Sequence, residues 1–262
     1  MSIFDGFKFR KVSSPIHNLD PRAKFIYVCV MFIVAILFIQ IIPLLVLFII
    51  QLPLIFIARV HKQWIRSMKG SALFAVLIFG MNAVSLHFYG GLNSLGAVIE
   101  RSLAVTIRFL VLIESFSVFF LTTSPDHLGL ALEQSGFPYD LCFAFTTAVR
   151  FVPVLAEEAQ TIMDAQRSRG LELDKGNLIT RMRNYIPILI PLIVNAIRRS
   201  LELAEAMESR AWGATSKRTN LYTLKMEMKD YYLICTSFII LTVFVYIWLN
   251  VHVPSLLEVL GY

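Results

Sequence analysis

Three long segments of this chain contain no Asp, Glu, Lys or Arg: residues 25–58, 71–99 and 231–257. Only 16% of the 262 residues are charged, whereas a soluble domain carries about a quarter. A long uncharged segment is stable in hydrocarbon as a helix, because a helix satisfies its own backbone hydrogen bonds. The chain is therefore predicted to be an all-α polytopic protein of the lipid bilayer.

The first uncharged segment is too long for one membrane span. A single helix over its 34 residues would extend about 51 Å, against a hydrocarbon core of about 30 Å. We therefore divide it into two spans that turn near residues 40–43. Further spans are predicted at 71–88, 101–121 and 231–250, which makes about five in total, with a turn at 90–93 before the fourth.

The basic residues predict the orientation of these spans. One group precedes the first span and another connects the second to the third, and the turns on the opposite side contain no Lys or Arg. The two groups are Lys8, Arg10, Lys11, Arg22 and Lys24, and Arg59, Lys62, Arg66 and Lys69. By the positive-inside rule, the N-terminus is expected in the cytoplasm and the C-terminus outside the cell membrane.

The region between the fourth and fifth spans is expected to be a cytoplasmic helical insert. We predict three domains: a membrane domain at 1–121, a coupling domain at 122–230, and a final span with its tail at 231–262. A short helix is predicted to start at Ser124–Pro125, because a hydroxyl cap followed by proline is typical of helix starts. Gly136 is expected to end it.

Two longer helices follow in the insert, and each changes from apolar to charged. One covers residues 137–169 and the other 188–210. The apolar part of the first, 137–156, is interrupted by charged residues and a proline, so a buried or interfacial helix is favoured over a span, and whether it enters the bilayer stays open. Whether 186–197 enters the bilayer stays open.

Both long helices end in the same short pattern, Ala-x-x-Ser-Arg-small. The two copies are Ala165 with Ser168, Arg169 and Gly170, and Ala206 with Ser209, Arg210 and Ala211. A single arginine at a helix end is most simply a solvated cation that complements the helix dipole. Two matched copies favour a pair of docking tips, because small neighbours leave the planar guanidinium free to enter a groove of a partner.

Few other residues suggest chemistry. The sequence has no spacing of histidines, cysteines or acids typical of a metal site, and it lacks the phosphate-binding loop of an ATPase. No catalytic residue, metal or cofactor is therefore expected, and the net charge of +6 is attributed to membrane topology and not to nucleic acid. Within the fourth span, Arg108 and Glu114 lie on different sides of the helix and are interpreted as polar contacts between helices, with a substrate or proton path as the alternative.

Five motifs, in order, resemble the EcfT/CbiQ family, the transmembrane coupling subunits of energy-coupling factor (ECF) transporters. They are Ser14–Lys24, Thr122–Pro125, Arg150–Pro153, Ala165–Gly170 and Ala206–Arg210. The resemblance implies two ATPase subunits as partners, each with a groove that receives one arginine tip. It also implies a separate substrate-binding membrane protein, the S component, for uptake of a vitamin or a metal ion. Substrate identity is not encoded in this chain.

The second motif departs from the family, because Ala211 stands where glycine is usual. Alanine favours helix and disfavours a left-handed turn, so the second tip is expected to continue as a helix. Two other functions remain open: an ABC importer permease that translocates substrate itself, and a membrane-embedded lipid-modifying enzyme using Glu157, Glu158 and Asp164.

Overall fold

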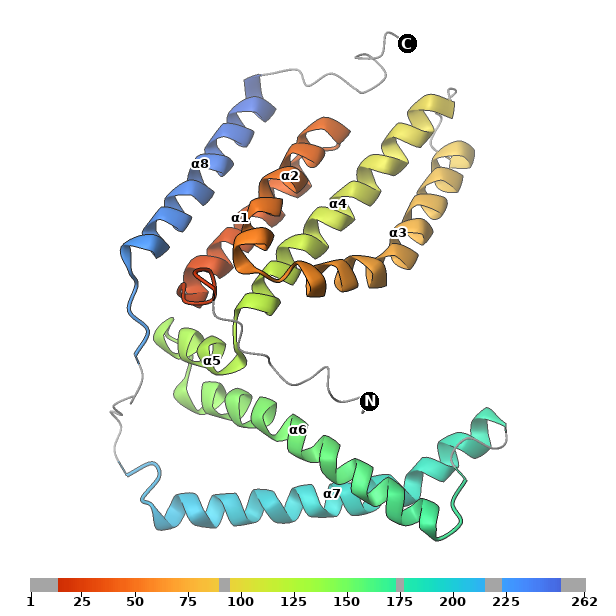
Figure 1. Cartoon of the computed structure of the whole chain (residues 1–262), viewed down its shortest axis with the longest axis vertical. Helices are drawn as coiled ribbons and strands as arrows, with labels where there is room; N and C mark the ends of the chain where they lie inside the picture. The colour runs from red at the N-terminus through yellow and green to blue at the C-terminus, as the bar shows by residue number, and fades with distance from the viewer. Residues whose placement is uncertain (1–13, 90–94, 173–176, 215–222, 251–262) are drawn as a thin grey trace. The chain divides into compact units, whose positions relative to one another are not determined.

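The computed structural model describes residues 14–89, 95–172, 177–214 and 223–250. These residues form eight α-helices joined by turns, with no strand among them (Figure 1). The predicted turn at 90–93 lies outside the described residues. The all-α fold class predicted from the sequence is confirmed.

The described residues divide into two compact units. The first, which we call the membrane unit, contains residues 14–134 and 224–250; the second, the helix-pair unit, contains 135–214 apart from the gap at 173–176. The helices of the membrane unit are α1 (Pro21–Leu37), α2 (Ile41–Ala58), α3 (His61–Tyr89), α4 (Leu95–Thr122), α5 (Pro125–Gln134) and α8 (Met228–Asn250). The helix-pair unit contains α6 (Tyr139–Ser168) and α7 (Leu178–Ser209).

Helix starts and stops in the membrane unit follow local sequence signals. The predicted break near residues 40–43 is confirmed, because α1 ends at Leu37 and α2 begins at Ile41. The Ser124 hydroxyl accepts a hydrogen bond from the His127 backbone N–H at 3.3 Å, so Ser124 caps α5 as predicted. After α5, Gly136 adopts φ +97°, the left-handed conformation that favours glycine at helix ends.

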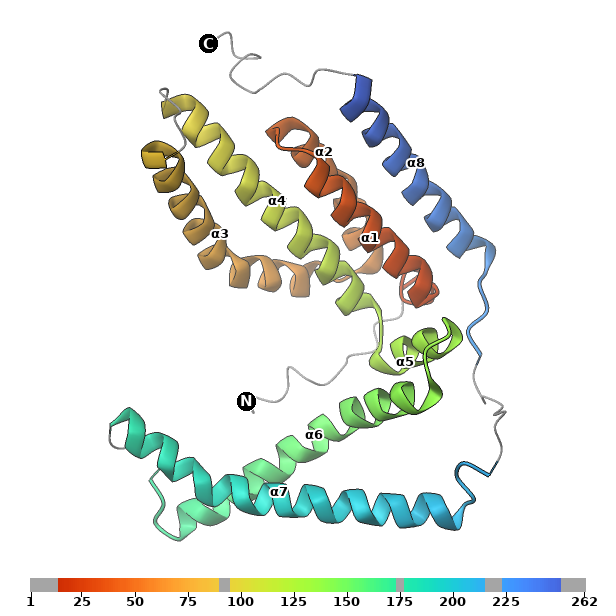
Figure 2. The ribbon, with the colours of Figure 1, turned by 180° about the vertical axis from the view of Figure 1, so that it is seen from behind.

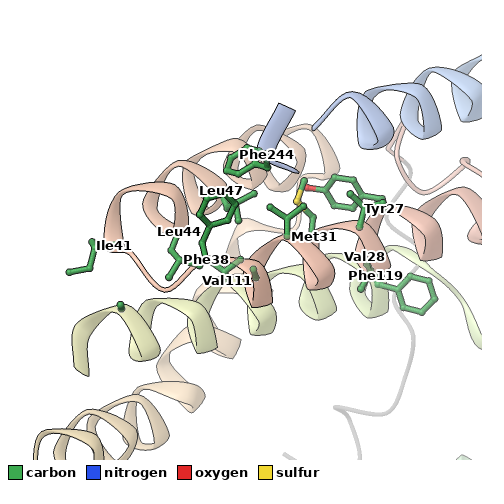
Figure 3. Packing of buried hydrophobic residues seen from close by; sticks show 14 residues of the cluster. Tyr27, Val28, Met31, Phe38, Ile41, Leu44, Leu47, Val111, Phe119 and Phe244 are labelled. Carbon is green, nitrogen blue, oxygen red and sulfur yellow. The ribbon is translucent and has the colours of Figure 1, made fainter. Parts of the chain in front are cut away.

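The core of the membrane unit lies between its first, second, fourth and last helices. α4 packs along α1, α2 and α3, and α8 packs along α1 (Figures 1 and 2). In Figure 3, Phe38, Leu47 and Phe244 converge beside Val111. The rings of Phe38 and Phe244 meet edge to face with centroids 5.6 Å apart. The last helix of the chain is therefore packed directly onto the first.

Five helices are long and apolar enough to cross a membrane: α2, α3, α4, α6 and α8. Their number agrees with the prediction, but two members differ. α1, predicted as a span, has 17 residues, about 25 Å, at the lower end of the length that crosses a bilayer. α6, favoured as a buried or interfacial helix with entry into the bilayer left open, has the length and composition of a span. Nine residues of α1 are buried within the unit, so α1 contributes mainly to the core.

A buried lysine joins three helix ends in the membrane unit. The Lys24 ammonium group donates to the backbone carbonyls of Thr122 at 2.9 Å and His17 at 3.2 Å. Asp230 accepts hydrogen bonds from the backbone N–H groups of Asp20 and Glu227, each at 2.8 Å. Asp20, Lys24 and Asp230 are all buried. We call these three residues the Lys24 cluster; it holds the starts of α1 and α8 against the end of α4.

His17 lies at the edge of this cluster. Its imidazole Nδ1 is 2.7 Å from the Ser14 hydroxyl oxygen. Burial, with a smaller contribution from the positive charge of Lys24, lowers the pKa of His17 below its ordinary value of 6.5. The neutral imidazole is therefore the stable form in the folded protein at neutral pH. Because the unfolded chain binds this proton more readily, His17 lowers stability as the pH falls below 6.5.

Candidate docking site on the paired helices

α6 and α7 form an antiparallel pair. Near the end of α6, the Gln166 side-chain amide donates to the Pro187 carbonyl, in the first part of α7, at 3.3 Å. Just after α7, the Trp212 ring packs at a tilt against Phe143 in the first turns of α6, with ring centroids 4.4 Å apart. The two helices therefore run in opposite directions; in Figures 1 and 2 they cross near the end of α6 and separate toward its start.

α7 begins ten residues earlier than the predicted start at Ile188. Pro187 and Pro191 lie inside the helix, although proline normally interrupts one. The Pro187 carbonyl would accept from the N–H of residue 191, which proline lacks. Gln166 supplies the missing donor from α6. A contact between helices therefore allows a helix that local sequence preference disfavours.

The first predicted tip closes α6 with two short-range hydrogen bonds. The Gly170 N–H donates to the Arg167 carbonyl at 2.9 Å, and the Leu171 N–H donates to the Gln166 carbonyl at 3.0 Å. Gly170 has φ +89°. This combination is the Schellman motif, in which a left-handed residue ends the helix and satisfies its last carbonyls. The predicted helix stop at Gly170 is confirmed.

The second tip has the same backbone hydrogen bonds, shifted along the chain by the distance between the motifs. The Ala211 N–H donates to the Glu208 carbonyl at 2.9 Å, and the Trp212 N–H donates to the Met207 carbonyl at 3.0 Å. Ala211 has φ +57°. The expected helical continuation at Ala211 is therefore wrong: the second tip is also a left-handed stop.

The packing of Trp212 explains this conformation. The indole lies against both Tyr139 and Phe143, with ring centroids 5.5 and 4.4 Å away. To place Trp212 there, the chain must turn sharply at Ala211, and the aromatic contact offsets the strain of a left-handed alanine, about 1 kcal/mol. A tertiary contact thus gives two different sequences the same backbone.

Replacing Ala211 by glycine is expected to stabilise the second tip by about 0.5–1 kcal/mol, because it removes the left-handed Cβ strain. Gly170→Ala is the reciprocal change; a Cβ there would meet no atom within 4 Å, so its cost comes from the backbone alone. Amide hydrogen exchange at the ends of α6 and α7 measures both effects. Faster exchange near residue 211 in Ala211→Gly would contradict the expectation.

The predicted tip residues are accessible. All of them are exposed: Ala165, Ser168, Arg169, Gly170, Ala206, Ser209, Arg210 and Ala211. Ser168 and Ser209 turn their hydroxyls back to carbonyls of their own helices, Asp164 and Ala206, at 3.0 and 2.9 Å. Among the described residues, neither the Arg169 nor the Arg210 guanidinium has a hydrogen bond or an ion pair. Both are available to a partner.

A polar contact that the sequence analysis missed fixes the two helices to each other. Glu158 of α6 accepts from the Asn195 amide at 2.6 Å and pairs with the Arg199 guanidinium at 3.0 Å, both on α7. Arg199 also lies 6.0 Å from the Phe151 ring centroid. We call Glu158, Asn195 and Arg199 the helix-pair lock. The residues are about 40 positions apart, so no local pattern reveals it.

The acids considered for an enzyme do not share one site. Glu158 is engaged by the lock, whereas the Asp164 carboxylate accepts from Gln160 at 3.1 Å and pairs with Arg167 at 3.5 Å. Gln160 and Arg167 also belong to α6, each about one turn from Asp164, so neither contact reaches another helix. The arrangement is that of solvated and interhelical ion pairs.

Arg108 and Glu114 of α4 do not pair with each other in the described structure. Arg108 donates to the Phe38 carbonyl at the end of α1. Glu114 is fully buried, and neither of its carboxylate oxygens has a hydrogen-bond partner among the described residues. Arg108 thus contacts the end of a neighbouring helix, whereas Glu114 makes no such polar contact among the described residues.

Comparison with known proteins agrees with this architecture. The CbiQ family model, described as "Cobalt transport protein", matches residues 12–221. The relatives named "Energy-coupling factor transporter transmembrane protein EcfT" include that of Staphylococcus aureus, 32% identical over 85% of this chain and 89% of the relative. Those of Thermosediminibacter oceani and Lactococcus lactis subsp. cremoris are 32% and 29% identical, over 83% and 91% of this chain and 88% and 95% of the relatives. The chain therefore belongs to the CbiQ/EcfT family of transmembrane transport proteins.

Proposed function

We propose that this chain is the coupling subunit of an ECF-type ABC importer and transmits ATP-driven motion of two ATPase subunits to a substrate-binding S component. The observation that carries the proposal is the pair of exposed arginine tips with matching backbone hydrogen bonds, at opposite ends of one antiparallel helix pair. The chain itself has no phosphate-binding loop, so ATP hydrolysis is assigned to the partners.

The tips suit a partner with two equivalent grooves. Each presents a guanidinium with five donors in one plane, which suits acceptors lining a groove. Because the two backbones end alike, one kind of ATPase surface can receive both. A homodimer of ATPases or a heterodimer with similar grooves satisfies this requirement, and closure of the dimer on ATP would move the tips relative to each other.

The apolar face of α7 suits the S component. Six exposed side chains follow helical spacing along one side: Ile186, Leu189, Ile190, Ile193, Val194 and Ile197. A stripe of this kind is unfavourable in water and marks an interaction surface with a membrane or a hydrophobic protein. The substrate class, a vitamin or a metal ion, is then determined by that partner and not by this chain.

The helix-pair lock is proposed to keep the two tips at a fixed distance and angle. Movement of one ATPase would then displace both helices together. Glu158→Gln is expected to weaken the lock by about 1–2 kcal/mol, because one charge-assisted hydrogen bond is lost from a partly exposed pair. The expected result is several-fold less substrate uptake per ATP hydrolysed, with the ATPases still bound. Proteoliposomes that report both uptake and hydrolysis measure this ratio.

Glu202→Gln is the matched control for that variant. Glu202 is exposed on α7, and its side chain forms no hydrogen bond or ion pair among the described residues. It should leave the ratio unchanged. An unchanged ratio in Glu158→Gln as well would remove the lock from the mechanism.

The orientation follows from the same proposal. The basic residues before and at the start of α1, together with Arg59 and those in the first turns of α3, support a cytoplasmic N-terminus beside the ATPases. The helix-pair unit then faces the cytoplasm and the C-terminus lies outside. Cysteines introduced at positions 2 and 262 check this. A membrane-impermeant thiol reagent added to intact cells should label position 262 and not position 2.

The experiment that tests the function is purification of the tagged chain from its native membranes in a mild detergent, with mass identification of what accompanies it. Two ATPase chains and a small hydrophobic membrane protein are expected. Recovery of the chain alone in several detergents would contradict the proposal. Turnover by the purified chain alone would instead favour the enzyme, and substrate transport without an S component the permease.

A further inference from the structure

α3 changes direction in its first third. Figures 1 and 2 both show its first turns running across α4 before the helix bends to run along it. We assign the bend to Gly70–Ser71 from the sequence, because the Ser71 hydroxyl donates to the Met68 carbonyl at 3.0 Å. Glycine–serine pairs and hydroxyl groups that bond back to the helix are known causes of kinks. The turns before this bend therefore form a separate short segment, His61–Lys69.

One side of this segment is fixed to the membrane unit. The hydroxyl groups of Ser67 and Ser117, on α3 and α4, lie 2.9 Å apart. Trp64 lies against Phe48 of α2, with ring centroids 6.5 Å apart. These contacts orient the segment, so the opposite side points away from the bundle.

That opposite side carries three cations, which we call the α3 basic stripe: Lys62, Arg66 and Lys69. Their spacing of four and three residues places them on one helical face, and all three are exposed. The sequence contains no Asp or Glu between Asp20 and Glu100, so no nearby acid in the chain neutralises them. In the described structure, none of the three forms an ion pair.

The same face becomes aliphatic immediately after the bend. Leu73, Val76 and Leu77 follow Lys69 by four, seven and eight residues, and their side chains are 67%, 71% and 52% exposed. One continuous outward face thus changes from cations to hydrocarbon within about one helical turn. This is the order in which an anionic phospholipid presents its phosphate and its acyl chain.

We propose that this face binds an anionic phospholipid, with the headgroup phosphate held by the α3 basic stripe and an acyl chain along Leu73, Val76 and Leu77. A cation near a membrane surface attracts anionic lipid with a strength that adds up over clustered basic residues. Lysine and arginine side chains also extend toward the headgroups from a helix in hydrocarbon. A protein partner would need acids opposite the stripe and a dry apolar surface directly beside them.

A tryptophan placed on the outward face provides a local reporter of the lipid. The chain has three tryptophans, so Trp64→Phe, Trp212→Phe and Trp248→Phe remove the native ones, and Leu73→Trp, at a position that is 67% exposed, supplies the reporter. The full-length chain is placed in nanodiscs that contain phosphatidylcholine and phosphatidylglycerol, with bromine on the acyl chains of one or the other at equal mole fraction. Brominated phosphatidylglycerol is expected to quench the reporter several-fold more strongly, and high salt should remove the preference.

The stripe is then neutralised in the reporter chain. Lys62→Gln, Arg66→Gln and Lys69→Gln together should make the two brominated lipids equally effective. The matched control is Arg101→Gln, Lys225→Gln and Lys229→Gln, three exposed basic residues elsewhere, which should keep the preference. Lys62→Arg with Lys69→Arg should keep it as well, and the salt titration needs no substitution at the stripe.

Three results would overturn the proposal. The first is equal quenching by both lipids in the reporter chain at low salt. The second is an unchanged preference in the triple stripe variant. The third is weak quenching by both lipids, which would show that the face is covered by protein. If the control triple variant lost the preference equally, the preference would come from the net charge of the chain. That result would also contradict a specific lipid site at the stripe.

Discussion

Arg169→Glu combined with Arg210→Glu is expected to abolish association with the ATPases while the chain keeps its helices. Both residues are exposed, and neither guanidinium forms a hydrogen bond or an ion pair among the described residues, so their replacement removes no polar contact from the fold. In a groove that receives a cation, a carboxylate meets like-charged or acceptor groups, and association should weaken on the order of a hundredfold or more. Copurification of the ATPases with the tagged chain measures the loss, and circular dichroism measures the helices.

Arg183→Glu with Arg198→Glu is the matched control, because it makes the same change in net charge at exposed positions of α7 outside the tips. It should leave the ATPases bound. If it removes them equally, the tips are not the docking site and general electrostatic attraction is responsible. ATPases retained in the tip variant would contradict docking directly.

The single variants test whether both tips are used. Their matching backbone hydrogen bonds predict similar, partial losses for Arg169→Glu and Arg210→Glu. From the sequence alone, the alanine at 211 predicted unequal tips. A harmless Arg210→Glu beside a damaging Arg169→Glu would show that a similar backbone is insufficient and that only the first tip engages a partner.

The sequence predicts the elements whose signals are local. Absence of charge identifies the spans, and the break between α1 and α2 follows because 34 uncharged residues exceed one bilayer crossing. Ser124 and Gly170 end or start helices through hydrogen bonds to residues within five positions. These signals depend on the backbone of a few neighbouring residues, so they need no knowledge of packing.

The predictions that failed depend on contacts between distant residues. The early start of α7 requires Gln166 to supply a donor to Pro187, and the left-handed Ala211 accompanies Trp212 packed on α6. In both cases a local preference against the observed conformation is overcome by one interhelical contact.

The candidate site divides in the same way. The two tips are visible as a repeated pattern, and their exposure follows from their polar surroundings. The helix-pair lock is not visible, because Glu158, Asn195 and Arg199 are ordinary residues in charged helical segments. Only the antiparallel arrangement brings the Asn195 amide within 2.6 Å and the Arg199 guanidinium within 3.0 Å of the Glu158 carboxylate. Residues that position a site are therefore harder to predict than those that form it.

Lys24→Met is expected to destabilise the membrane unit by about 3–5 kcal/mol, the usual cost of removing one partner from a buried group of charges. Lys24 is 5% exposed, and Asp20 and Asp230 are 4% and 2% exposed. Without the ammonium group, the buried Asp20 and Asp230 carboxylates lose its positive charge, although Asp20 keeps Arg22 at 4.0 Å, and the carbonyls of His17 and Thr122 lose their donor. The apparent Tm in detergent should fall by about 10 °C or more.

Two comparisons separate this effect from general loss of charge. Lys229→Met removes an exposed lysine one residue before Asp230 and should change the apparent Tm little. Asp230→Asn in the Lys24→Met background removes one of the stranded charges, so the double variant should recover part of the lost stability. A Lys24→Met chain as stable as Lys229→Met would mean that the carboxylates are solvated in the membrane and that the Lys24 cluster does not hold α1, α4 and α8 together.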